Sequence, residues 1–156
     1  MARDEHALQA AVEQSAAVLT AAGFPKMPAR VMMTLTYAEN GGLTAQELGD
    51  YLQVSAAAIS GAVRYLQTIG FVRRVAQPGS RRDRYEFPSD AWAAAIMSER
   101  PVYSAMATLA EAAYAAIDDP ESAPAKRADE LARFYRFLER RLPEVMAEWE
   151  TLRGQL

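Results

Sequence analysis

The sequence contains no cysteine and a single histidine, His6. Disulfides, thiolate nucleophiles, cysteine-ligated zinc and iron–sulfur clusters are therefore excluded, and one imidazole near the start of the chain is a poor basis for catalysis or metal binding. No apolar run approaches the roughly 20 residues of a membrane helix, and the first ten residues carry acids where a signal peptide needs positive and then apolar residues. We expect a cytoplasmic protein that is not an enzyme, with no cofactor, no metal and no membrane partner.

The composition is that of a folded chain. Hydrophobic residues make up 51% and charged residues 24% of 156 residues. This length suits one ordinary domain with appendages, and the hydrophobic share is too high for a disordered chain.

Charge is distributed unevenly along the chain. The net charge is −3, but residues 1–54 carry −3, residues 55–88 carry +4 and residues 89–156 carry −4. An acidic total taken alone argues against a nucleic-acid partner, because phosphate binding leaves a basic footprint. The concentration of positive charge in one segment makes that segment the main candidate for function.

Apolar residues at helical spacing occur from the start of the chain. Residues 4–22 form a first amphipathic pattern that Gly23 and Pro25 end. A second pattern has Pro28 in its first turn, where a missing N–H costs nothing, and ends at Asn40-Gly41-Gly42.

The middle of the chain predicts two short helices joined by a tight link. Thr44 and Glu47 match a capping box, so a helix is expected to begin at Ala45 and to end near Leu52. Ser55 is the candidate N-cap of the next helix, which Gly70 closes. Two such helices, each with one apolar face, are typical of a helix-turn-helix.

A hairpin pattern follows directly. Residues 71–76 and 84–87 are predicted strands around the turn-forming cluster Pro78-Gly79-Ser80. The order of two helices and a hairpin is typical of a winged helix.

The last third of the chain is predicted to be helical. A helix capped by Ser89 is expected to run to about Ile117 with a kink or break at Pro101. Asp118-Asp119-Pro120 marks a boundary, and the final helix carries an apolar heptad seam that Pro143 interrupts. The seam consists of Leu131, Tyr135, Leu138, Leu142, Val145, Trp149 and Leu152. Three heptads are enough for helix pairing, and in a monomer the seam would be an exposed apolar face.

Six arginines lie on the predicted second helix and hairpin: Arg64, Arg73, Arg74, Arg81, Arg82 and Arg84. A helix fits the major groove of B-DNA, and an arginine-bearing hairpin tip can follow the phosphate backbone or enter the minor groove. The alternative is a solvated face in which the arginines pair with Asp83 and Glu86. Two acids are too few to pair six arginines, so we favour double-stranded DNA as the partner.

The stretch TAQELGDYLQVSAAAISGAVRYLQTIGFVRRVAQPGSRRDRYEF resembles the DNA-binding module of the multiple-antibiotic-resistance regulator (MarR) family over residues 25–88. Its wing, PGSRRDRYE, resembles the branch related to glycine-betaine-sensing repressors. The resemblance implies a mostly α fold with a small β-hairpin wing, in which a winged helix-turn-helix is flanked by N- and C-terminal dimerisation helices. It also implies a homodimeric transcriptional regulator that binds successive major grooves of a pseudo-palindromic operator, and we expect a repressor.

The resemblance assigns roles by position. Residues 1–24 become the N-terminal dimerisation helix, residues 25–88 the DNA-binding domain and residues 89–156 the C-terminal dimerisation region. The groove-facing positions are Ser55, Ala57, Ala58, Ser60, Gly61 and Arg64, with Arg74, Arg81, Arg82 and Arg84 on the wing. Within these terminal helices, the apolar helical spacing predicts the dimer contacts Leu8, Val12, Leu131, Tyr135, Leu138, Leu142 and Trp149.

Departures from the family pattern affect specificity. Alanine stands at positions 57 and 58, where many relatives have Ser or Thr, and glycine at position 61, where many have Arg. Fewer bidentate base contacts remain, so we expect DNA shape and the wing to carry much of the specificity.

Two questions stay open. The aromatics outside the module, many of them in the last two helices, are explained first as core or dimer seam, and otherwise as a pocket for a small-molecule effector such as a quaternary ammonium. The alternative function is a winged helix that binds only protein and does not bind DNA.

Overall fold

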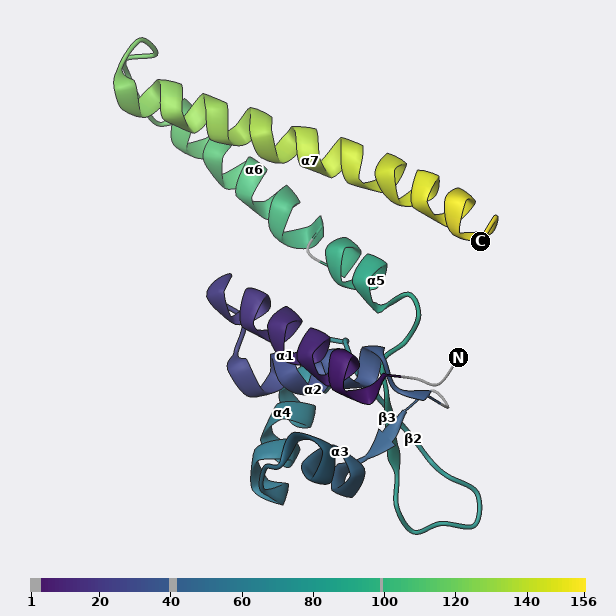
Figure 1. The fold of residues 1–156 in the computed structure, drawn as a ribbon. Coiled ribbons are helices and arrows are strands. Elements are labelled where there is room, and N and C mark those ends of the chain that lie inside the picture. Colours follow the sequence, from purple (N-terminus) through teal and green to yellow (C-terminus); the bar gives the residue numbers. More distant parts are fainter. Residues whose placement is uncertain (1–3, 40–41, 99) are drawn as a thin grey trace. The chain divides into compact units, whose positions relative to one another are not determined.

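A computed structural model describes residues 4–39, 42–98 and 100–156, which contain seven α-helices and three short β-strands (Figure 1). The chain divides into two compact units, Met1–Trp92 and Ala93–Leu156. The first unit combines the N-terminal helix with the helix-turn-helix and its wing, so the helix in residues 1–24 shares a core with the winged helix. The second unit is helical.

Unit 1 begins with two packed helices, α1 (Glu5–Ala21) and α2 (Lys26–Thr36). Arg30 joins these helices to the end of a third. Its Nε and Nη2 donate to the carboxylate of Glu13 at 2.6–3.0 Å, and Nη2 also donates to the Leu52 carbonyl oxygen at 3.3 Å. This half-buried guanidinium therefore fixes α1 against the helix-turn-helix. The predicted stop at Asn40 and Gly41 lies outside the described residues.

The helix-turn-helix matches the sequence prediction closely. In α3 (Ala45–Leu52), the Glu47 N–H donates to the Thr44 hydroxyl at 3.2 Å, and the Thr44 N–H donates to the Glu47 carboxylate at 2.7 Å. This confirms the capping box. In α4 (Ala56–Thr68), the Ser55 hydroxyl accepts from the Ala58 N–H at 3.2 Å. Each N-cap satisfies backbone donors that would otherwise lack partners, which is why both helices begin where predicted.

The wing is part of a three-stranded antiparallel sheet in the order β1-β3-β2. The predicted hairpin is present as β2 (Arg73–Val75) and β3 (Arg84–Glu86), and β1 (Leu43–Thr44) pairs with β3 in the register Leu43↔Tyr85. The sequence analysis missed β1, because two residues are too few to show an alternating pattern. A Cβ at Gly42 would lie 2.5 Å from the Tyr85 carbonyl oxygen, so this close approach of the two strands requires glycine.

Apolar side chains from all the helices of the winged helix and from α1 meet in one core. Its largest fully buried members are Met32, Leu48, Ile59, Leu66, Val12 and Val31. Five aromatic rings extend this core to the end of the unit, through contacts of Phe24 with Tyr65 and Phe71, and of Phe71 and Phe87 with Trp92. The base of the wing and the start of the next helix are therefore anchored to the core.

Unit 2 is built on two long helices. Helices α5 (Ala91–Ser98) and α6 (Arg100–Ala115) are separated by position 99, which lies outside the described residues, so the expected kink or break at Pro101 stays a prediction. Pro101 is the second residue of α6, and α5 begins at Ala91, so Ser89 is not its N-cap. Helix α7 (Ala123–Arg153) continues through Pro143. Helices α6 and α7 lie side by side (Figure 1), with buried alanines on both that allow close approach.

Polar contacts also hold α6 to α7. The Arg136 guanidinium donates to Glu111 at 2.8 and 2.9 Å and to Glu139 at 2.8 Å. These hydrogen bonds raise the pKa of Arg136 and lower that of Glu111. No helix among the described residues is both long enough and apolar enough to cross a membrane.

Candidate nucleic-acid interface

Helix α4 has a buried face and an exposed face. Ile59, Ala62, Val63 and Leu66 are buried in the core. The predicted groove-facing residues lie on the other side: Ser55, Ala57, Ser60, Gly61 and Arg64 are exposed, and Ala58 is half-buried. A Cβ at Gly61 would meet nothing within 4 Å, which agrees with an open surface. The helix thus presents a small, shallow surface with one long basic side chain.

The two acids of the wing each engage one arginine. Arg73 and Glu86 are paired across β2 and β3, and Arg73 Nη2 donates to the Glu86 carboxylate at 3.0 Å. Arg74 forms an ion pair with Asp83, and this carboxylate raises the pKa of the Arg74 guanidinium. Arg73 and Arg74 are therefore each paired with an acid, as the solvated-face alternative expects for these two residues.

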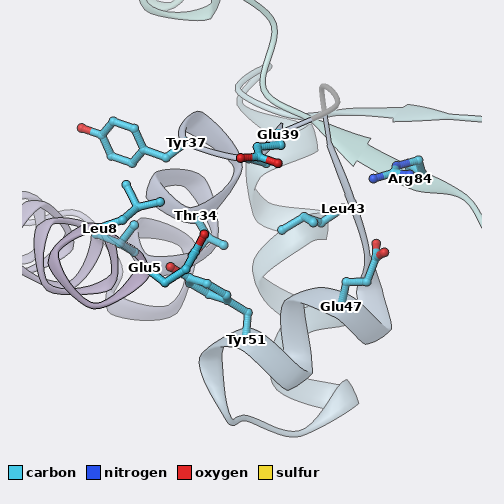
Figure 2. Close-up of a pocket in the computed structure, with 11 residues that line it drawn as sticks. Glu5, Leu8, Thr34, Tyr37, Glu39, Leu43, Glu47, Tyr51 and Arg84 are labelled. Atoms are coloured by element: carbon cyan, nitrogen blue, oxygen red, sulfur yellow. The ribbon is translucent and has the colours of Figure 1, made fainter. Parts of the chain in front are cut away.

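Arg84 is directed into its own unit. Its Nη2 donates to the Gly42 carbonyl oxygen, and its Nε is buried without a hydrogen-bond partner. The residue borders a cavity of about 250 Å³ enclosed by α1, α2, β1, α3 and β3. Figure 2 shows side chains from these elements around it, with Glu47 and Leu43 near Arg84 and Leu8 on the α1 side. A half-buried guanidinium engaged in this way supports the base of the wing.

Four of the six arginines form no ion pair with a carboxylate in the described parts of the chain: Arg84, which donates to the Gly42 carbonyl oxygen, and the exposed Arg64, Arg81 and Arg82. Arg64 is on α4, whereas Arg81 and Arg82 are at the wing turn. The Ser80 hydroxyl accepts from the Arg82 N–H at 3.0 Å, and Arg82 Nη1 donates to Gln46 Oε1 on α3. The sequence analysis did not single out Gln46, because no local pattern relates it to a residue 36 positions away.

The residues predicted to mediate dimerisation are placed differently in the two units. Val12 is only 1% exposed and belongs to the core of unit 1, so it offers no surface to a second chain, and Leu8 is half-buried beside the cavity. On α7, Leu131 and Trp149 are 40% and 43% exposed. The remaining predicted residues, Tyr135, Leu138 and Leu142, are half-buried, and Tyr135 stacks on Tyr103.

A helix-turn-helix with an exposed second helix, followed by an arginine-bearing hairpin, defines the class of winged-helix DNA-binding proteins. Residues 22–83 match the model of the MarR family, and residues 90–152 match the model of the MmpR5-like MarR family transcriptional regulators. The chain therefore belongs to the MarR family of winged-helix transcriptional regulators, and DNA binding is a property of this family.

Solved structures agree with this fold. The crystal structure of a transcriptional regulator is 21% identical, with 92% of this chain and 98% of that chain covered and a TM-score of 0.75. A probable transcriptional regulator from Pseudomonas aeruginosa is 20% identical over 97% and 93% of the two chains, with a TM-score of 0.42. A MepR mutant from S. aureus bound to an oligodeoxyribonucleotide is 13% identical over 85% and 88%, with a TM-score of 0.43. The structural assignment of the fold rests on the first of these. No curated protein matches the chain.

Proposed function

We propose that this MarR-family protein is a sequence-specific repressor that binds a pseudo-palindromic operator as a homodimer. The observation that carries the proposal is the exposed face of α4 together with three exposed arginines, Arg64, Arg81 and Arg82, that form no ion pair within the described ranges. Exposed guanidinium groups bind phosphates and guanine edges, and here they lie in the one segment of an acidic chain that carries a net positive charge. This proposal retains the cytoplasmic location expected from the sequence and gives the protein no catalytic role.

In the proposed complex, α4 enters the major groove. Arg64 is the side chain with the reach and donors for a guanine, whereas Ala57 and Ala58 offer only methyl contacts to thymine. Ser55 caps the helix and can also contact a phosphate. Arg81 and Arg82 on the wing turn contact the backbone or the minor groove, so the sequence preference depends in part on DNA shape.

The proposed dimer uses the C-terminal part of α7. Helix α6 has 16 residues and α7 has 31, so an antiparallel α6 covers only about the first half of α7. Beyond that half, Val145, Trp149 and Leu152 are exposed large apolar residues on the predicted heptad seam. A second copy of α7 offers the same surface, and a two-fold dimer matches the two half-sites of a palindrome.

A small-molecule effector completes the proposal. The wing motif between Pro78 and Glu86 supports the glycine-betaine-related branch, and an effector would release DNA by preferring one spacing of the two α4 helices. Choline or betaine that binds without changing DNA affinity would contradict this regulatory step while leaving DNA binding itself unaffected.

Fluorescence anisotropy tests the main proposal. The DNA upstream of the protein's own gene is titrated with protein and compared with scrambled DNA over a salt series. We expect a preference for the upstream DNA and a steep loss of affinity with salt. Arg64→Ala should reduce discrimination between the two DNAs, whereas Arg82→Ala should weaken both and flatten the salt dependence.

A matched control is Arg127→Ala, which removes an exposed arginine from α7 in unit 2. It should leave both affinities unchanged. A protein with no affinity for any DNA at any salt concentration would instead support the alternative, a winged helix used for protein binding. Sedimentation of the native protein tests the dimer, and Trp149→Glu should shift it toward the monomer.

A further inference from the structure

One side-chain contact joins the wing turn to the helix-turn-helix. Gln46 is the second residue of α3, and its Oε1 accepts a hydrogen bond from Nη1 of Arg82. Together with Thr44 and Tyr85, the two residues border a hollow of about 300 Å³ between α3 and the wing. The contact therefore fixes a guanidinium of the wing over the start of α3.

The environment of Arg82 leaves Gln46 as its side-chain partner. Asp83, the adjacent acid, is engaged by Arg74, and Glu86 is engaged by Arg73. The Ser80 hydroxyl accepts from the Arg82 backbone N–H and so shapes the turn without holding the side chain. The orientation of the guanidinium thus depends on one amide oxygen.

The chemistry of the amide matters here. A glutamine accepts from a guanidinium without neutralising it, whereas a glutamate at the same place would form an ion pair and cancel its charge. Arg82 is therefore held in place while keeping its full positive charge. Arg73 and Arg74 are also held in place, but by carboxylates that offset their positive charge.

We propose that Gln46 is a positioning residue that orients Arg82 for contact with a DNA phosphate. The inference rests on the proposed DNA-binding function and adds to it a residue that acts through another. A flexible arginine loses rotamer freedom when it binds, and part of that loss is avoided if the side chain is already ordered. The gain expected is roughly two- to tenfold in affinity per wing, the size typical of ordering one long side chain.

A double-mutant cycle tests this role. Gln46→Ala should weaken DNA binding roughly two- to tenfold per wing. In the Arg82→Ala background the same change should have no effect, because the side chain that Gln46 orients is gone. Gln46→Ala should keep the salt dependence of the native protein, since no charge is lost, whereas Arg82→Ala should reduce the slope by about 0.9 per wing.

Two further variants sharpen the result. Gln46→Glu should fold normally, because an acid in the first helical turn is favourable, but its ion pair with Arg82 should flatten the salt slope as Arg82→Ala does. Arg81→Ala is the matched control for the cycle. Arg81 is an exposed neighbour for which no contact with Gln46 is described, so its loss and Gln46→Ala should be additive.

Two results of the double-mutant cycle would refute the positioning role of Gln46. If Gln46→Ala weakens binding equally with and without Arg82, Gln46 contacts DNA itself or supports α3, and the positioning role is refuted. If Gln46→Ala leaves affinity unchanged, the contact does not contribute, and the role is also refuted.

A measurement without DNA tests the positioning role of Gln46 independently of the proposed DNA-binding function. ¹⁵N relaxation of the Arg82 Nε–H in the free protein should show restricted motion in the native chain and faster motion in Gln46→Ala. Equal mobility in both proteins would overturn the inference whatever DNA binding shows. Restricted motion in a protein that binds no DNA would refute the proposed function instead.

Discussion

The ion pair between Arg74 and Asp83 limits the charge available to DNA, and Asp83→Asn should release it. The side chains are 63% and 27% exposed, so solvent screens the pair and its loss should not unfold the wing. The substitution leaves the size of the side chain nearly unchanged and removes one negative charge. It should therefore convert Arg74 from a neutralised residue into a further phosphate contact.

The expected salt dependence of DNA binding follows from the number of guanidinium groups that contact phosphates. Arg81 and Arg82, the proposed phosphate contacts in each protomer of the dimer, give a slope of log affinity against log salt of roughly −4, at about −0.9 per phosphate neutralised. Asp83→Asn adds one contact per protomer and should steepen the slope to roughly −5. A unit charge about 6 Å from a phosphate in water is worth about 0.7 kcal/mol, so affinity at low salt should rise about threefold per wing.

The assay is fluorescence anisotropy on one operator fragment at several salt concentrations. Asp129→Asn is the matched control, because Asp129 pairs with Arg133 on α7 at 2.7 Å and its replacement changes the net charge by the same amount in unit 2. The control should keep the native slope. A native slope in Asp83→Asn, or the same change in both variants, would refute the reasoning that this pair withholds Arg74 from DNA.

Three further predictions concern stability. Leu48→Ala removes a fully buried side chain and should cost about 2–5 kcal/mol in urea unfolding; a loss below 1 kcal/mol would contradict the described packing. Gly42→Ala places a Cβ 2.5 Å from the Tyr85 carbonyl oxygen, so hydrogen exchange at the β1–β3 pairing should become faster, and unchanged exchange would contradict the close approach. Arg136 lowers the pKa of Glu111, so this pair should stabilise unit 2 fully above about pH 4.5. That stabilisation should be lost as the pH falls through the lowered pKa of Glu111. Thermal unfolding between about pH 2.5 and 7 should show this loss of stability, and Glu111→Gln should reduce it.

Within unit 1, one arginine links the N-terminal helices to the helix-turn-helix. Arg30 ties α1 and α2 to the end of α3 through Glu13 and the Leu52 carbonyl oxygen. A ligand or a partner chain that shifts α1 would therefore act directly on the helix-turn-helix. The half-buried guanidinium makes this link sensitive to loss of its carboxylate, because a partly desolvated charge would then lack its partner.

The elements of the DNA-binding module could be predicted because their signals are local. Thr44 with Glu47, and Ser55 with the N–H of Ala58, are contacts between residues three apart, and they determine where α3 and α4 begin. The restriction of positive charge to residues 55–88 is likewise a property of the chain order. Local hydrogen bonds and composition need no knowledge of the fold, so the sequence by itself determined the helix-turn-helix, the hairpin and the segment in which positive charge is concentrated.

Only the tertiary structure decided which residues of that segment remain available. The decisive contacts form only when the chain folds. Arg73 and Arg74 pair with acids on the opposite side of the hairpin, and Arg84 and strand β3 contact Gly42 and strand β1, which lie far back in the sequence. The role of Val12 is also not readable from the sequence, since an apolar residue at helical spacing suits a core and a dimer surface equally well. The structure places its side chain in the core of unit 1. Sequence spacing fixes which face of a helix a side chain occupies, but the element packed against that face is set by contacts that form only when the chain folds.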